Sequence, residues 1–257
     1  MISARLRILI ASTLAILVAG STITMATGSG SFKDGHLPGT MSRPETGDRA
    51  VGVTAPPSQM PPVIEVLIQD NLISRVNNEI SAIKSLIRSL PEGSRVLTGY
   101  ITTGTLNVTQ DFTTNRNRAA DSLRILRGES AAPYNPYVEL IEGLKRFDSQ
   151  PQGRRIVLLI SDGVDLSHGF ADANPSLSLD LDRSIRDAQQ RGVAVFSFFA
   201  PESNLAGHNS LLISFGQGSL NKLADKTGGK AFYTGTTFVS FSPYIKGFRS
   251  SLGLGGQ

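Results

Sequence analysis

The feature that most constrains the fold is an aliphatic run, Ile156 to Ile160, that leads directly into Ser161-Asp162-Gly163. Five aliphatic residues without polar alternation predict a strand that is buried on both faces, as in the centre of a parallel sheet. The turn that follows must place the carboxylate of Asp162 at the carboxyl end of that strand. Ligands bind at this edge in open α/β sheets, because loops and helix N-termini converge there. The sequence therefore predicts a fold class and the place of a site.

Strand and helix patterns alternate from residue 63 to residue 253. Strands are predicted at 63–70, 95–103, 105–112, 154–161, 193–200 and 231–234, and helices at 76–90, 115–127, 136–144, 181–191, 219–227 and 241–252. The two strands around Gly104 predict a hairpin. Together these patterns predict a doubly wound, mostly parallel central sheet flanked by helices, with one antiparallel edge strand.

Two helices carry more specific expectations. In the helix after Pro136, we expect Val138, Ile141 and Leu144 to face the core, because their spacing places them on one side of a helix. Ser219 is expected to cap the next-to-last helix, which the glycine pair after residue 227 ends. Residues 166–180 form a polar connection longer than most loops of α/β proteins.

The first 62 residues predict export rather than a folded domain. Arg5 and Arg7 precede an uncharged apolar stretch, and small residues follow it, so residues 1–26 are expected to be a signal peptide cleaved after Ala26. The alternative is an uncleaved anchor, since the stretch is nearly long enough to span a bilayer. Residues 27–62 are rich in Pro, Gly, Ser and Thr and predict a disordered tether. Either reading places the domain outside a bacterial cytoplasm, as a periplasmic, secreted or envelope-anchored protein.

Composition excludes several classes of function. The chain has 257 residues and no cysteine, which excludes disulfides, zinc–thiolate sites and cysteine nucleophiles. Its net charge is +4, and the lysines and arginines are scattered rather than gathered in a run that could follow a phosphate backbone. Nucleic acid is therefore not an expected partner.

Three segments resemble the von Willebrand factor type A domain in its bacterial exported form, over residues 63–253. They are Leu159-Ile160-Ser161-Asp162-Gly163, the segment from Leu223 to Tyr233, and Asp111-Phe112-Thr113-Thr114-Asn115. The resemblance implies a Rossmann-like sheet with a metal-ion-dependent adhesion site at its carboxyl edge. In that family the site uses Asp-x-Ser-x-Ser after the first strand, a threonine in a later loop and an aspartate after the fourth strand.

Matched to that motif, the chain keeps only part of the site. Asp70, Ser74 and Asp162 match the first aspartate, the second serine and the later aspartate, whereas Leu72 stands where the first serine should be. The threonine position falls on Ala131 and leaves Ser130 as a weak substitute. Mg²⁺ and Ca²⁺ prefer oxygen ligands, so the resemblance implies a degenerate metal site at these residues.

Support for catalysis is weak. The sequence has no Gly-x-Ser-x-Gly elbow, phosphate loop or dinucleotide fingerprint after the first strand. One remaining enzymatic alternative is a hydrolase that uses the loop from Asp162 to His168.

The sequence therefore favours a non-enzymatic interaction module with little or no metal dependence. It is expected to bind a protein or another cell-envelope component through loops 71–75, 128–137, 163–181 and 201–218. The alternative is an adhesion module that depends on Mg²⁺ or Ca²⁺ held by Asp70, Ser74 and Asp162.

Overall fold

The sheet has the predicted architecture. The computed structural model describes residues 60–128, 135–202, 209–235 and 240–254. Its sheet has the order β3-β2-β1-β4-β5-β6, and every neighbouring pair is parallel except the β2–β3 hairpin. The strands are β1 (Val63–Gln69), β2 (Arg95–Thr102), β3 (Thr105–Thr113), β4 (Arg155–Ser161), β5 (Val193–Phe199) and β6 (Ala231–Phe232).

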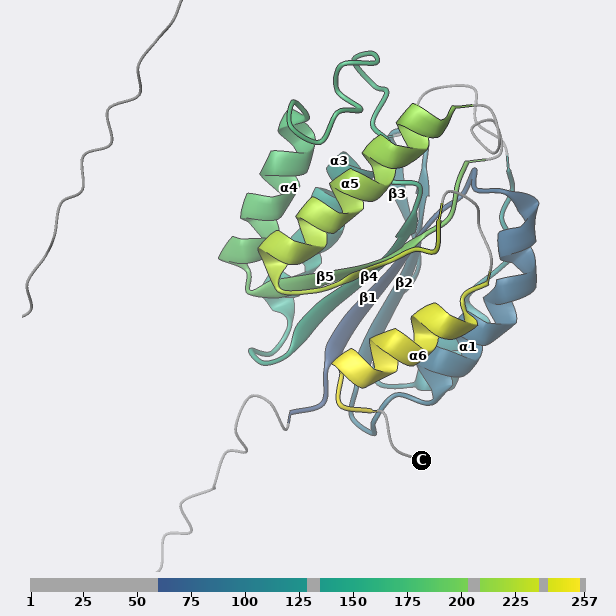
Figure 1. The fold of residues 1–257 in the computed structure, drawn as a ribbon. Helices are drawn as coiled ribbons and strands as arrows, with labels where there is room; N and C mark the ends of the chain where they lie inside the picture. Colours follow the sequence, from purple (N-terminus) through teal and green to yellow (C-terminus); the bar gives the residue numbers. More distant parts are fainter. Residues whose placement is uncertain (1–59, 129–134, 203–208, 236–239, 255–257) are drawn as a thin grey trace, which may run out of the picture. The chain divides into compact units, whose positions relative to one another are not determined.

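Helices cover both faces of this sheet. They are the 3-10 helices η2 (Ser74–Glu79) and η3 (Lys145–Ser149), and the α-helices α1 (Ile80–Arg88), α2 (Arg116–Asp121), α3 (Pro136–Leu144), α4 (Leu179–Gln190), α5 (Ser210–Thr227) and α6 (Ser242–Ser251). Helices α3, α4 and α5 lie on one face, and α1 and α6 lie on the other (Figure 1). The layers are those of a doubly wound α/β fold.

Strand β4 lies at the centre of the core, as its aliphatic run predicts. All seven of its residues are buried. Ile156, Leu158 and Ile160 pack in the core under α1 and α6, while Val157 and Leu159 pack under α3, α4 and α5. Burial on both faces explains why the run shows no polar alternation.

Helix α3 presents a different face to the core from the one predicted. Val138 is 41% exposed, whereas Tyr137, Leu140 and Leu144 are fully buried. The reason is the anchor at its first turn, where the hydroxyl of Tyr137 donates to the carbonyl oxygen of Gly163 at 2.6 Å. The prediction for Val138 is therefore wrong, Ile141 is half-buried, and Leu144 is buried as predicted.

Helix α5 begins nine residues earlier than predicted, at Ser210 rather than Ser219. Asn209 is its N-cap, and its side-chain oxygen accepts from the backbone N–H of Leu212 at 3.0 Å. Ser219 is buried in the middle of the helix. Gly216 and Gly218 interrupt the apolar period there, which is why the pattern concealed the first half of the helix. Part of the predicted recognition loop 201–218 is therefore helical.

Helix α2 is also shorter than the predicted helix 115–127. It ends at Asp121, and residues 123–128 continue without regular structure.

The predicted signal peptide and residues 27–59 of the tether lie outside the described residues and stay predictions. Within the described part of the chain, no helix is both long and apolar enough to span a bilayer.

Candidate functional site at the carboxyl edge of the sheet

The ends of β1 and β4 are neighbours, as the site prediction requires. The two strands pair in parallel, with Ile68 opposite Ile160. At their ends, the side-chain oxygen of Gln69 accepts from the hydroxyl of Ser161 at 2.6 Å and from the backbone N–H of Asp162 at 3.3 Å. Asp70 and Asp162 therefore follow adjacent strands at the same edge of the sheet.

Asp70 is held by an arginine of the same chain. The two guanidinium nitrogens of Arg124 donate to the two carboxylate oxygens of Asp70 at 2.9 and 2.7 Å. The backbone N–H of Arg127 donates to one of those oxygens at 2.9 Å. A bidentate pair of this kind is strong and orders both side chains.

These contacts decide the charge of Asp70. Burial alone would raise its pKa, but the hydrogen bonds from Arg124 and Arg127 and the charges of both arginines outweigh burial and lower the pKa. The carboxylate is thus ionised over the physiological range, with its charge compensated by Arg124.

Arg124 lies in the irregular segment 123–128, most of which was predicted to be helical, and Tyr100 holds it in place. Its guanidinium carbon lies 4.0 Å from the ring centroid of Tyr100, a cation–π contact. The Tyr100 hydroxyl donates to the carbonyl oxygen of Arg124 and accepts from its N–H. The N–H of Gly128 donates to the backbone oxygen of Asp70 at 3.0 Å. Sequence reasoning missed Arg124, because nothing in a helical pattern shows that the chain leaves the helix to reach this edge.

Asp162 is in a different environment. Its carboxylate is buried and accepts from the backbone N–H of Val164 at 2.9 Å. Burial raises its pKa to about 7, and the nearby charge of Glu202 adds to the rise. Asp162 and Asp70 thus share an edge, but their carboxylates have different partners.

The donor set does not suit a divalent cation. A cation bound by Asp70 would have to displace Arg124, whose guanidinium donates to both carboxylate oxygens. Leu72, which stands in place of the first serine, is buried and forms a β-bridge with Glu202. Ser74 is exposed at the start of η2, and Ser130 lies outside the described residues. Over the described ranges, no group of three or more His, Cys, Asp or Glu side chains is arranged to hold a metal ion. The metal-ligand assignment stays a prediction.

A second set of carboxylates lies under the loop that follows β4. Asn135 donates to Asp180 at 2.8 Å and to the hydroxyl of Ser167 at 3.1 Å, and that hydroxyl donates to Asp165 at 2.6 Å. Glu139 is buried beside them. Burial, together with the charges of Asp165 and Asp180, raises its pKa to about 7. Three acidic side chains, Glu139, Asp165 and Asp180, thus lie near one another beneath this loop.

The histidine of the same loop does not form a catalytic relay. Nδ1 of His168 lies 3.0 Å from the hydroxyl of Ser167 and 3.3 Å from a carboxylate oxygen of Asp172. A Ser–His–Asp relay needs the two nitrogens of the ring to serve the two partners, one each. Here both partners face the same nitrogen, and the imidazole is 69% exposed. The hydrolase alternative gains no support from this geometry.

A pocket of about 480 Å³ lies at the opposite edge of the sheet, lined by residues that include Arg155 and Arg191. The guanidinium nitrogens of Arg155 donate to the carbonyl oxygens of Gln150, Pro151 and Arg191. Arg191 pairs with Asp148 and Asp187. Each guanidinium is thus engaged within the chain, and the charge of Arg191 is compensated by Asp148 and Asp187.

Comparisons with known proteins agree with the fold. No family model matches the sequence, and no curated protein matches it. Solved structures do match. The von Willebrand factor type A protein from Catenulispora acidiphila is 17% identical with a TM-score of 0.50, over 75% of this chain and 42% of that one. BatB from Bacteroides thetaiotaomicron, a conserved hypothetical protein, is 12% identical with a TM-score of 0.51, over 75% and 96%.

A third match is the human COPII-coat protein Sec24c, 12% identical with a TM-score of 0.53, over 75% of this chain and 32% of that one. At such low identities these likenesses concern the fold alone. The chain has the von Willebrand factor type A fold, as its motifs predicted.

Proposed function

We propose that this chain is an exported, non-enzymatic module that binds a protein partner through the carboxyl edge of its sheet without a metal ion. The observation that carries the proposal is the bidentate pair of Arg124 with Asp70. In the metal-dependent form of the fold, a divalent cation would compensate this aspartate. Here an arginine of the same chain does so.

The rest of the edge supports a binding surface. The loop at residues 71–73 is pinned to the residues after β5, since the N–H of Ile73 donates to the carbonyl oxygen of Pro201 at 3.0 Å. Loops that a rigid sheet holds in place are a common means of protein recognition. Neighbours with the same fold include the human COPII-coat protein Sec24c.

Capture of envelope proteins by the immobilised full chain tests the proposal. Capture is expected to be equal in EDTA and in Mg²⁺, because Arg124 compensates Asp70 in both. Arginines placed on the carboxyl edge in the double variant S74R/S176R are expected to block it. The matched control is S149R, since Ser149 is also exposed but lies near the opposite edge.

Two results would contradict the proposal. Loss of capture in EDTA would favour the alternative, cation-dependent adhesion. Equal capture by S74R/S176R and by the unaltered chain would place recognition elsewhere on the molecule.

A further inference from the structure

The loop that follows β4 carries exposed apolar side chains, and these have no role in the core. Phe170 is 51% exposed and Leu177 is 57% exposed, while Leu211, at the start of α5, is 49% exposed. The ring of Phe170 lies 6.1 Å from the ring of Phe215, centroid to centroid. Leu211 and Phe215 are one helical turn apart and therefore share a face of α5. We call Phe170, Leu211 and Phe215 the apolar surface.

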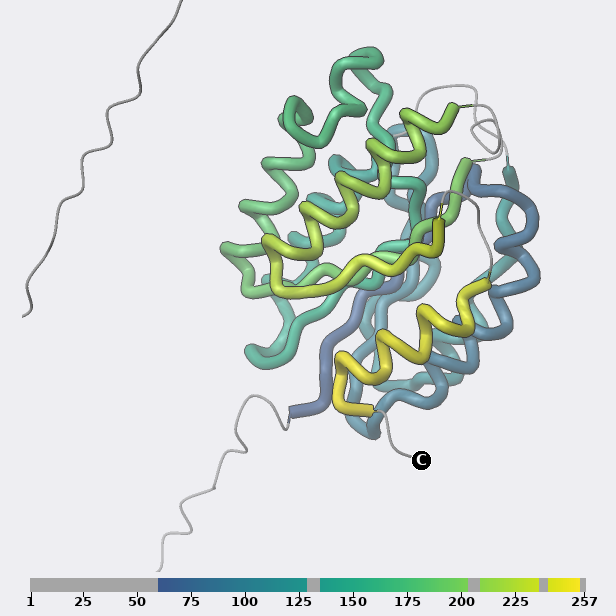
Figure 2. Tube along the Cα trace, in the orientation of Figure 1, coloured from purple at the N-terminus to yellow at the C-terminus, as the bar shows by residue number. Residues whose placement is uncertain are grey.

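This surface is held in shape from beneath. Val164, Ala173 and Leu212 form a small buried cluster, against which Phe215 packs. Lys222 of α5 donates to the carbonyl oxygen of Pro175 at 2.7 Å, which ties the loop to the helix. Figure 2 shows the loop at the same end of the sheet as the first turns of α5. An exposed aromatic residue on a supported loop is a common feature of binding surfaces.

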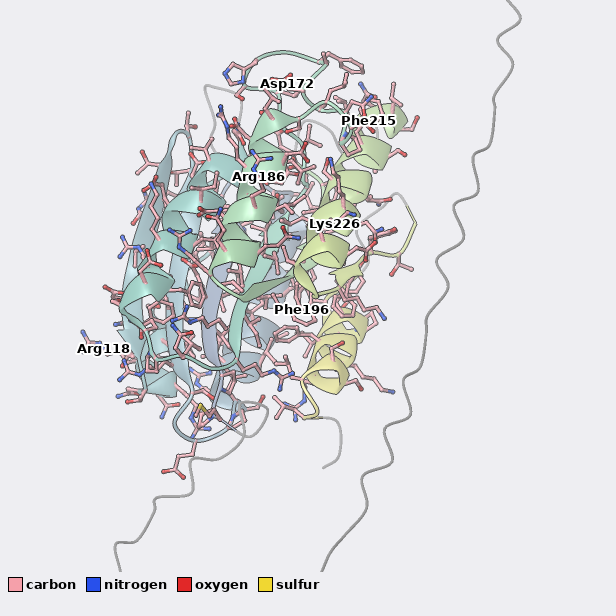
Figure 3. The ribbon with its side chains drawn as sticks, turned by 90° about the vertical axis from the view of Figure 1, so that its left-hand side faces the viewer. Arg118, Asp172, Arg186, Phe196, Phe215 and Lys226 are labelled. Atoms are coloured by element: carbon pink, nitrogen blue, oxygen red, sulfur yellow. The ribbon has the colours of Figure 1, made fainter. Side chains whose placement is uncertain are left out.

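The segment that carries Phe170 has an excess of acidic residues. The segment 161–182 contains no lysine or arginine and five aspartates, namely Asp162, Asp165, Asp172, Asp180 and Asp182. Arg183 pairs with Asp180 and Lys222 pairs with Asp182. Asp172 pairs with His168, which is positive only when protonated. Figure 3 shows Asp172 and Phe215 at one end of the molecule, with Arg186 and Lys226 further from that end.

We infer that the apolar surface and its acidic surroundings bind a partner segment that combines apolar side chains with lysines or arginines. The inference rests on the proposed function and names the chemistry of its partner. Apolar contact supplies affinity, and the negative charge selects a basic partner and speeds its approach. The same charge disfavours an anionic bilayer, which would otherwise suit exposed Phe and Leu side chains.

Fluorescence anisotropy with two labelled synthetic peptides tests the inference. Both have about 14 residues, roughly four helical turns. One is built from Lys and Leu, and the other from Glu and Leu. The full chain is expected to bind the Lys/Leu peptide at least about tenfold more tightly than the Glu/Leu peptide, with the preference falling as salt is added.

Variants show where the peptide binds. F170S/L211S is expected to weaken binding of the Lys/Leu peptide about tenfold or more. The control I125S/Y233S removes apolar side chains of similar exposure, 67% and 42%, outside the apolar surface and is expected to bind normally. D172N is expected to weaken binding at low salt, and D225N, at the far end of α5, is not. All six positions are partly or largely exposed, so these variants should fold.

Several results would overturn the inference. Equal binding of the two peptides, or an equal loss in I125S/Y233S, would show that the affinity is unspecific. Binding to neutral phosphatidylcholine vesicles that F170S/L211S abolishes would assign the surface to lipid. Self-association in sedimentation that the same variant abolishes would assign it to a second copy of this chain. If F170S/L211S still captures envelope proteins normally, the inference fails while the proposed function stands.

Discussion

At the scale of single residues, the decisive feature is that Asp70 has an internal counter-ion. The motif identifies Asp70 from the sequence, because a carboxylate directly after the first strand is expected at the carboxyl edge. Arg124 could not be identified in this way. Its position depends on residues 123–128 leaving the helix and returning to β1 through Gly128, which no local period encodes.

Replacing Arg124 by methionine should destabilise the protein. The variant keeps the length of the side chain but leaves Asp70 buried without its cation, at a cost of about 3 kcal/mol. Urea denaturation should show this loss for R124M and almost none for R118M, because Arg118 is exposed on α2. In D70N/R124M part of the stability should return. Equal stability of R124M and the unaltered chain would mean that the pair contributes nothing.

Glu65 is a second residue that the sequence did not single out. It lies in β1, is fully buried, and neither of its carboxylate oxygens has a hydrogen-bond partner among the described residues. It faces α3 at Gly143, where any larger residue would collide with the carboxylate. Burial raises the pKa of Glu65 to about 8; Arg146 opposes the rise and Asp111 adds to it. An acid in this setting stays protonated in the folded state.

The stability of the protein should therefore fall as the pH rises from about 4.5 to about 8. In that window the unfolded chain has lost the Glu65 proton and the folded chain retains it, so unfolding releases a proton. E65Q should flatten this decline and be more stable than the unaltered chain at about pH 8.5. Urea denaturation at about pH 5 and about pH 8.5 measures the difference. E92Q, at an exposed position, is the control. If the stability of E65Q declines with pH as steeply as that of the unaltered chain, Glu65 is not the group responsible.

At the scale of elements, close packing of α5 against the turn after β4 shapes the carboxyl edge. Gly163 has a positive φ of 70°. A side chain there would meet the backbone of Gly216, and a side chain at Gly216 would meet the carbonyl oxygen of Asp162. The two glycines thus let the helix and the turn touch through their backbones. Gly216 also interrupts the apolar period of α5, so the sequence pattern did not show where this helix begins.

G216A should be destabilised by about 1–3 kcal/mol, although alanine favours helices over glycine. The added methyl group would push α5 away from the turn at Asp162. G218A is the control in the same helix, because its methyl group would contact only a side-chain atom of Pro175. G218A should lie within about 1 kcal/mol of the unaltered chain. If thermal unfolding finds G216A as stable as G218A, the helix does not depend on this close approach.

At the scale of the whole molecule, the sequence predicts the fold well and the site only in part. A hydrophobic run such as that of β4 directly predicts a buried strand. The order of strands and helices along the chain then allows only a few sheet topologies. The site depends on contacts between distant segments, such as Asp70 with Arg124 and Tyr137 with Gly163. Those contacts follow from packing and not from the local pattern. For the same reason, the motif alone predicted a degenerate metal site and could not show which group compensates Asp70.

The central claim is that Arg124, and not a divalent cation, compensates Asp70 at the recognition edge. A calorimetric melt of the full chain in Mg²⁺, in Ca²⁺ and in EDTA tests it most directly, since a ligand that binds only the folded state raises the melting temperature. The same melting temperature is expected in all three conditions. A melting temperature that rises with Mg²⁺ or Ca²⁺, and returns to its starting value in EDTA, would contradict it.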